Sequence, residues 1–309
     1  MAKKIKRKAP RGKSSPLPPL PSRESMERVT ADLHRLLEGQ QFQSLDEANK
    51  FLQNLHGQVP RSSARSPLEK AQDLAWEAWD AATPRQAAKL ARQALAISPD
   101  CADAYNVLAE SEARTPKEVY ALYQKAVDAG ERSLGQAFFE EHKGHFWGLL
   151  ETRPYMRARQ GLADSLWGLG QEEEAIAHYE AILKLNPGDN QGIRDALLSR
   201  YLTRGNDAGV SRLYEQYPDD WSASFLWSQV LLECRRGDHR AAAKALRHAM
   251  QQNPYVPDYL IGTTKLPRSL PDSYSVGGKD EAVLYIFHFG GAWITTPAAL
   301  VWLFEQMKR

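Results

Sequence analysis

Apolar side chains recur at helical spacing through residues 156–190, in two runs that a glycine separates. These residues are Leu162, Ala163 and Leu166 in the first run, and Ala175, Tyr179 and Ile182 in the second. Each run places its apolar residues on one face of a helix. Gly170 separates the two helices, and Pro187 ends the second because proline has no N–H to donate. The stretch therefore predicts a helix–turn–helix unit.

The same spacing occurs three times in the chain, with twelve residues between successive marker positions. The markers are Ala75, Ala87 and Pro99; then Ala163, Ala175 and Pro187; and finally Val230, Ala242 and Pro254. A small residue where two helices cross and a proline at the exit are typical of the tetratricopeptide unit of about 34 residues. The pattern predicts an all-α fold, a right-handed solenoid of such units.

The distances between the exit prolines give the number of units. Weaker units at 102–134 and 190–222 bring the total to five tetratricopeptide (TPR) units over residues 68–256. One interval is too long, which predicts an insertion at about residues 135–155. Because this insertion is rich in aromatic residues, we expect a lengthened helix that extends the second unit and packs on the third.

The flanks of the repeats have different compositions. Residues 1–23 form a basic and proline-rich tail, which we expect to be disordered. Residues 24–60 predict a small N-terminal helical pair, whose second helix starts with a capping box at Ser44 and Glu47. Residues 61–67 read as a linker, and residues 257–309 as a C-terminal helical module.

Residues 282–304 contain no charged side chain, so a membrane span has to be considered. Against a span stand Gly290 and Gly291, the helix start at Thr296, and His288 near the centre. Two short apolar helices that cap the open end of the solenoid explain the same residues, because terminal repeats need a cover. We therefore expect a C-terminal capping module and no contact with a membrane.

Charge is concentrated at the start of the chain, whose overall net charge is only +2. The basic residues there are Lys3, Lys4, Lys6, Arg7, Lys8, Arg11 and Lys13. They suggest an alternative function as a nucleic-acid- or ribosome-associated protein, because lysine clusters displace counterions from phosphates. A solubilising tail without a specific ligand explains them as well. No apolar core of a secretory signal follows, and two isolated cysteines fit a reducing compartment, so we expect a cytoplasmic protein.

The first helices of stacked units line a concave groove, and some of their residues are not used by the repeat core. These candidates for binding an unidentified protein or peptide are Gln72, Trp76, Trp79, Asn106, Glu110, Arg157, Gln160, Asp164, Trp167, Arg194 and Tyr201. Tryptophan, tyrosine and arginine are enriched where proteins bind one another. Core packing of the tryptophans, and surface ion pairs of the two arginines with Asp164 or Glu110, are the alternatives.

The sequence offers no catalytic set. It has no glycine-rich phosphate loop, nucleophile elbow or paired-cysteine motif, and His142 and His145 have no third metal ligand at a recognisable spacing. We therefore expect a binding scaffold that is not an enzyme and uses no cofactor or metal.

Three arginines, Arg153, Arg157 and Arg159, stand where the insertion rejoins the repeats. Burying them unpaired would be costly, so we expect at least one of them in a buried ion pair. The acids nearest in sequence are Glu140, Glu141, Glu151 and Asp164. Arg157 is expected to stay open to the groove.

Residues 137–198 contain the strings RPYMRAR and LNPGDNQGIR within FFEEHKGHFWGLLETRPYMRARQGLADSLWGLGQEEEAIAHYEAILKLNPGDNQGIRDALL. This stretch resembles the repeat region of suppressor-of-tumorigenicity-seven-like proteins. The C-terminal module, with YLIGTTKLP and TPAALVWL, resembles an end module of bacterial tetratricopeptide proteins of unknown function. The resemblance implies a repeat fold and no particular activity. Animal members of the family have membrane segments ahead of the repeats, where this chain has its basic start.

Overall fold

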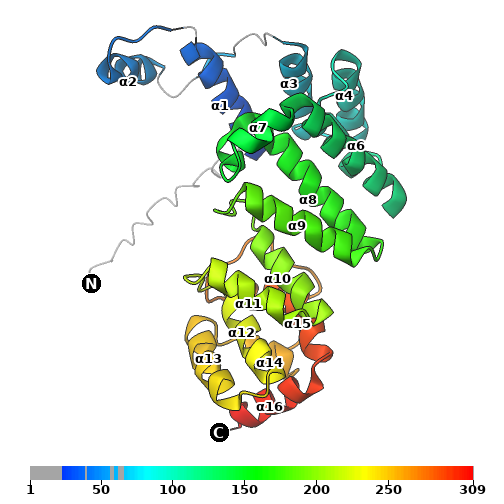
Figure 1. Ribbon diagram of the computed structural model, residues 1–309, viewed down its shortest axis with the longest axis vertical. Coiled ribbons are helices and arrows are strands. Elements are labelled where there is room, and N and C mark those ends of the chain that lie inside the picture. Colours follow the sequence, from blue (N-terminus) through cyan, green and yellow to red (C-terminus); the bar gives the residue numbers. More distant parts are fainter. Residues whose placement is uncertain (1–22, 39, 56–58, 62–65, 309) are drawn as a thin grey trace, which may run out of the picture.

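The computed structural model describes residues 23–38, 40–55, 59–61 and 66–308, and within them every regular element is a helix (Figure 1). In chain order these are α1 (Arg23–Glu38), α2 (Leu45–Asn54), α3 (Pro67–Trp79), α4 (Pro84–Ile97), α5 (Ala102–Ser111), α6 (Pro116–Leu134), α7 (Gln136–Glu141), the 3-10 turns η1 (Phe146–Gly148) and η2 (Leu150–Thr152), α8 (Arg153–Gly168), α9 (Glu172–Leu185), α10 (Ile193–Arg204), α11 (Asp207–Gln216), α12 (Ala223–Arg235), α13 (His239–Gln252), α14 (Val256–Leu260), α15 (Lys279–Ile294) and α16 (Pro297–Met307). The basic tail lies outside the described residues.

Five successive helix pairs form the body of the molecule: α3–α4, α5–α6, α8–α9, α10–α11 and α12–α13. They stack along the long axis in Figure 1, and neighbouring first helices touch, α3 with α5, α5 with α8, and α10 with α12. Four of the alanines that define the repeat spacing are fully buried, namely Ala75, Ala163, Ala175 and Ala242. A side chain of this size lets two helices cross closely. The prediction of an all-α, TPR-like solenoid is confirmed.

Side-chain caps determine where several of these helices begin. Ser66 and Glu69 form a reciprocal capping box at the start of α3. The hydroxyl of Thr83 accepts a hydrogen bond from the Gln86 amide at 3.2 Å, and Thr115 caps α6 in the same way. Each cap satisfies an amide that has no partner within its own helix, and each of these three helices has a proline in its first turn, where no N–H is needed.

A glycine on α8 shows how closely the second and third units approach. A Cβ atom built on Gly161 would overlap the ring of Tyr123 from α6, whereas one built on Gly168 of the same helix would meet nothing. We predict that Gly161→Ala lowers the free energy of unfolding by about 1–3 kcal/mol through overpacking. The matched Gly168→Ala should raise it by about 0.5–1 kcal/mol, because alanine favours helix. Urea unfolding of both variants is the test, and equal effects would contradict it.

The insertion differs from its expected form. Helix α6 is long, but it ends at Gly135, whose φ of +76° is in the left-handed region that favours glycine. The short helix α7 and the turns η1 and η2 follow instead of one continuous helix. The ring of Phe139 lies 4.9 Å from that of Phe146 and 5.0 Å from that of Tyr155 on α8. These rings attach the insertion to the third unit.

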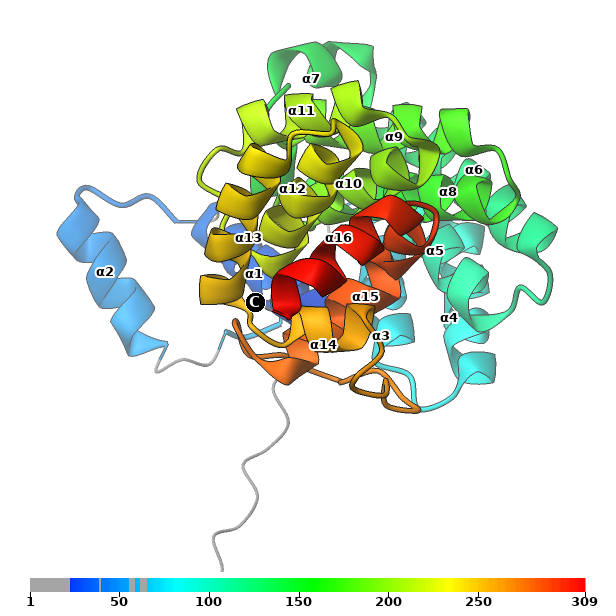
Figure 2. The ribbon, with the colours of Figure 1, turned by 90° about the horizontal axis from the view of Figure 1, so that it is seen from below.

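The two N-terminal helices form, but they do not pack on each other as a pair. Helix α2 stands apart from the rest of the chain in Figures 1 and 2, and no residue of it is buried. Helix α1 lies against α3. Its charged side faces the repeats, because Glu27, Asp32 and Arg35 are buried while Met26 is 51% exposed.

The C-terminal helices lie along the repeats. Helix α15 contacts α10 and α12, the first helices of the last two units, and α16 contacts α12 (Figure 2). The module expected at the open end of the solenoid therefore also covers part of the inner face. Among the described residues, no single helix is long and apolar enough to cross a membrane. The bent pair α15–α16, with 117° between its helices, meets the length and composition required when taken together.

Candidate protein-binding groove

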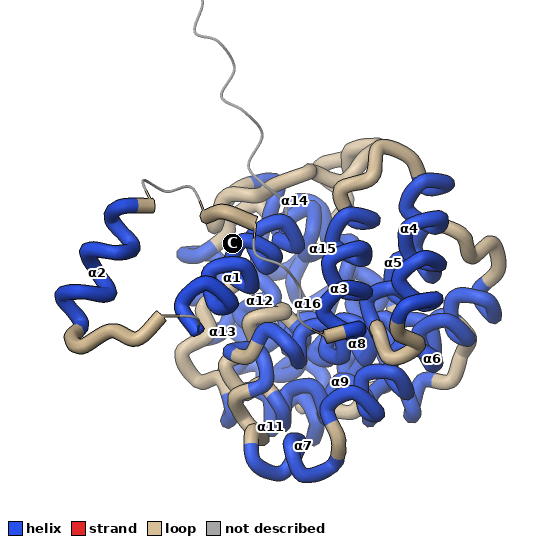
Figure 3. Tube along the Cα trace, turned by 90° about the horizontal axis from the view of Figure 1, so that it is seen from above, coloured by secondary structure: helices blue, strands red, loops and turns tan. Residues whose placement is uncertain are grey.

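The inner face of the solenoid consists of the first helices α3, α5, α8, α10 and α12. Two further helices cover parts of it. Helix α1 lies over α3, α5 and α8 near the N-terminal end, and α15 lies over α10 and α12 near the other end (Figures 1 and 3). What a partner can reach depends on how these two helices are held and on what they leave uncovered.

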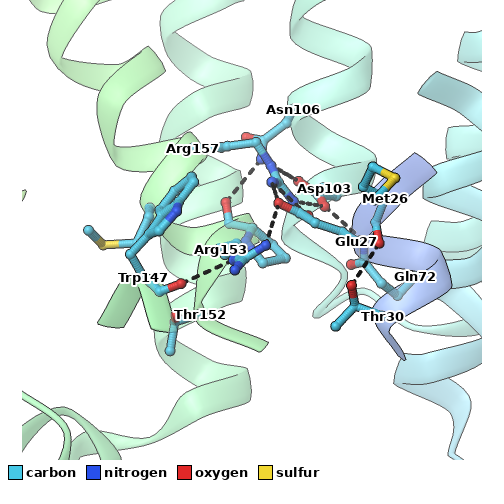
Figure 4. Close-up of polar contacts among 12 residues, drawn as sticks. Met26, Glu27, Thr30, Gln72, Asp103, Asn106, Trp147, Thr152, Arg153 and Arg157 are labelled. Carbon is cyan, nitrogen blue, oxygen red and sulfur yellow. Dashed lines mark hydrogen bonds and ion pairs between the residues drawn. The ribbon is translucent and has the colours of Figure 1, made fainter. Parts of the chain in front are cut away.

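Arg157 of α8 holds α1 in place. Its Nη2 lies 2.6 Å from Asp103 Oδ2 on α5, and its Nη1 lies 2.9 Å from both carboxylate oxygens of Glu27 on α1 (Figure 4). Arg153 adds a weaker contact at 3.4 Å from Glu27 Oε1, and it donates to the carbonyl oxygen of Trp147. One guanidinium therefore joins three helices.

The two carboxylates around Arg157 respond differently to burial. Burial alone would raise the pKa of the fully buried Asp103, but the charge and hydrogen bonds of Arg157 hold that pKa below its usual value. At Glu27 the desolvation caused by burial is the larger effect, and the pKa is raised despite Arg157. The ion pair between Asp103 of α5 and Arg157 of α8 is therefore strongly favoured. Docking of α1 is less favourable, because it buries the Glu27 carboxylate and burial destabilises the charged form of that group.

Arg157 was expected to stay open to the groove, and that prediction is wrong. Its side chain is only 14% exposed, because Asp103 lies beneath it and α1 lies above it. The buried pair that we expected at Arg153 or Arg159 is made mainly by Arg157. Its partners are also not the acids nearest in sequence, since Glu27 is 130 residues away along the chain.

Three other predicted groove residues belong to the same covered region. Gln72 Nε2 donates to Asp103 Oδ2 at 2.7 Å, and Asn106 Nδ2 donates to Asp103 Oδ1 at 3.0 Å. Trp76 is buried and lines a small cavity under α1. Gln72 and Asn106 support the ion-pair network and Trp76 is buried under α1, so these three side chains are not free to bind a partner.

Between α1 and α15 the inner face encloses a cavity of about 400 Å³. We call it the central cavity. Its polar lining comes from α8, α10, the start of α12, α15 and the loop before α15, and comprises Gln160, Asp164, Asp195, Ser199, Arg200, Ser222, Ser224, Tyr274, Glu281, Tyr285 and His288. Of the predicted groove residues, Gln160 and Asp164 lie here. Trp167 is adjacent, because the Arg200 guanidinium carbon lies 4.5 Å from the centre of its ring.

Two charged residues of the central cavity each have one buried side-chain atom without a hydrogen-bond partner among the described residues. Asp195 Oδ1 and Arg200 Nε are buried atoms that no donor or acceptor of the described residues reaches. Burial, with the charge of Asp220 as the next cause, raises the pKa of Asp195 from 3.8 to about 7. Buried polar groups in folded proteins are usually paired, so these two atoms are exceptions that need an explanation.

The remaining predicted residues lie elsewhere. Arg194 turns away from the cavity, with its Nε 2.7 Å from Asp220 Oδ2 and its guanidinium over the ring of Tyr217. Tyr201 is buried, and its hydroxyl donates to Glu180 of α9. Among the described residues, no ion pair joins Arg157 or Arg194 to Asp164 or Glu110. Trp79 is partly buried in the core around α3 and α4, and Glu110 is exposed and accepts a hydrogen bond from Tyr123.

The sequence contained a signal for Asp195 that we did not use. Gln160 stands two residues before Leu162, the core leucine of the third unit, and Asp195 stands two residues before Leu197, its counterpart in the fourth. Asp164 and Ser199 correspond in the same way. Reading the fourth unit in this register would have predicted Asp195 and Ser199 in place of Arg194 and Tyr201. His288 and Tyr274 had no such signal, because they belong to the C-terminal module.

Comparison with known proteins shows which proteins the repeats resemble. Residues 62–189 match the family model described as ST7 protein. The Protein ST7 homolog of Drosophila melanogaster is 27% identical over 247 residues, which is 72% of this chain and 46% of that protein. The Suppressor of tumorigenicity 7 protein-like of Homo sapiens is 29% identical over 247 residues, 72% of this chain and 43% of that protein. The chain is similar to the ST7 proteins over most of its length.

The chain spans less than half the length of the ST7 relatives it matches. The family model covers α3 to α9 and the insertion and ends before α10, so Asp103 and Arg157 fall inside it and Asp195 and α15 fall beyond it. Among solved structures, the chain is similar to one titled "Crystal structure of YrrB: a TPR protein with an unusual peptide-binding site". The TM-score is 0.36 and the identity 15%, over 60% of this chain and 84% of that chain.

Proposed function

We propose that this relative of the ST7 proteins is a cytoplasmic protein-interaction scaffold without catalytic activity. It binds an extended segment of a partner protein on the inner face, in the central cavity between α1 and α15. The observation that carries the proposal is a cavity on that face that contains unpaired buried polar atoms, Asp195 Oδ1 and Arg200 Nε.

The binding surface is smaller than the one expected from the sequence. It comprises Gln160, Asp164 and Trp167 of α8, Asp195, Ser199 and Arg200 of α10, and the facing residues of α15. The surface combines the Trp167 ring, on which Arg200 is stacked, with buried polar atoms that have no hydrogen-bond partner among the described residues. This composition suits a site that binds a polypeptide.

Site-specific photocrosslinking tests this function. A benzoylphenylalanine at Ser224, which lines the central cavity, should crosslink to discrete polypeptides when the full chain is incubated in lysate. The same group at Gln93, an exposed residue on α4, is the matched control and should give none of these products. Identical products from both positions, or no product from Ser224, would exclude the central cavity as the binding site.

A further inference from the structure

The central cavity has an electrostatic character that narrows down what it binds. Asp164 of α8, Asp195 of α10 and Glu281 of α15 line it, against one lining arginine, Arg200. Arg200 is stacked on Trp167, and its positive charge also acts on Asp164. The lining therefore carries an excess of carboxylates, supplied by three different helices.

The three carboxylates differ in how many hydrogen bonds they accept. Glu281 is fully engaged, since it accepts hydrogen bonds from Gln252, Asn253 and the amide of Gly277. Asp164 accepts one hydrogen bond, from the hydroxyl of Tyr179. Asp195 accepts none from the residues that the structure describes, and its Oδ1 is buried. Asp195 is therefore the group with the most unused capacity to accept hydrogen bonds.

Asp195 caps no helix and forms no ion pair among the described residues. The amides at the start of α10 that have no partner within the helix are already capped by Asp189, which accepts hydrogen bonds from Ile193 and Arg194 at 2.7 and 2.9 Å. The nearby cation, Arg194, pairs with Asp220. The charges that Asp195 feels are those of Asp220, Arg194, Asp189 and Glu281, three acids and one base. Its surroundings are therefore short of positive charge.

We infer that the central cavity is a receptor for the side chain of a lysine or arginine in the bound segment, held by Asp195 and Asp164. A cationic group would supply the donors that Asp195 Oδ1 lacks and would offset the excess of carboxylates. Hydrogen bonds between an ammonium or guanidinium group and a carboxylate are about twice as strong as neutral ones. This inference rests on the proposed function and specifies its ligand as a basic segment.

Fluorescence anisotropy with labelled nine-residue peptides tests the inference on the full chain. Oligo-arginine should bind, and the double variant Asp164→Asn with Asp195→Asn should raise its dissociation constant at least tenfold. The control is Asp128→Asn with Glu173→Gln, two exposed acids outside the cavity, which changes the net charge equally and should alter the constant less than twofold. Asparagine keeps the shape and the acceptor oxygen, so the comparison isolates the charge.

Two results would overturn the inference. One is an equal loss of oligo-arginine binding in both double variants, which would reveal attraction to the overall charge only. The other is oligo-glutamate binding as tightly as oligo-arginine. Crosslinking from Ser224 separates this failure from that of the proposed function. If the lysate products persist unchanged in the Asp164→Asn, Asp195→Asn chain, the cavity still binds a protein and only the preference for a basic side chain is wrong. If the chain without these two substitutions gives no product from Ser224, both the proposed function and the preference are wrong.

Discussion

Replacing Arg157 by methionine should lower the free energy of unfolding by about 3–5 kcal/mol, the usual cost of removing one partner from a buried ion pair. The loss leaves Asp103 buried in α5 without its cation, and Asp103 exposes no surface to solvent. It also detaches α1, because Glu27 loses its closest partner. Chemical denaturation followed by circular dichroism measures the change.

Two matched variants test whether the expected loss of stability is caused by the burial of the Arg157 ion pairs. Arg132→Met removes an arginine whose pair with Asp100 is solvent-exposed, so it should cost only about 0–1 kcal/mol. Glu27→Gln keeps the Arg157–Asp103 pair, and should loosen α1 with a smaller loss of stability. Hydrogen exchange should then increase in α1 and leave α5 and α8 protected. An Arg157→Met protein as stable as the Arg132→Met protein would mean that the network contributes little.

Asp195→Asn should stabilise the protein at pH 8 and change little at pH 4. The folded-state pKa of Asp195 is raised to about 7 from 3.8, so the folded state holds this proton more tightly than the unfolded state does. The cost of the buried charge is therefore absent below about pH 4 and grows as the pH rises to about 7. One pKa unit corresponds to about 1.4 kcal/mol, which allows a gain of about 1–4 kcal/mol at pH 8.

Thermal unfolding of the two proteins across pH 4–8 measures this gain. The difference in melting temperature should open between pH 4 and pH 7 and stay constant above it. Asp128→Asn, at an exposed position, should follow the unmodified protein at every pH. A constant difference at all pH values would show that Asp195 is not a buried carboxylate. A more stable Asp195→Asn protein also ensures that any loss of peptide binding is not caused by unfolding.

Local sequence determined the repeat architecture, because its signals act over short distances. Alanines such as Ala163 and Ala175 fix where two adjacent helices cross, and caps such as Thr83 fix where a helix begins. These interactions join residues within one unit or one turn. They predicted the helix pairs of the all-α, TPR-like solenoid.

Only the tertiary structure decided which part of the inner face is covered. Arg157 meets Glu27 across 130 residues, and Ser199 donates to the carbonyl oxygen of His288 across 89. Nothing in the spacing of either segment indicates that α1 and α15 lie along the repeats, since both helices have apolar patterns that suit several partners. The surface left over, with Asp195 unpaired between them, results from packing between distant segments. A local sequence pattern cannot encode this surface, because its extent depends on where α1 and α15 pack against the repeats.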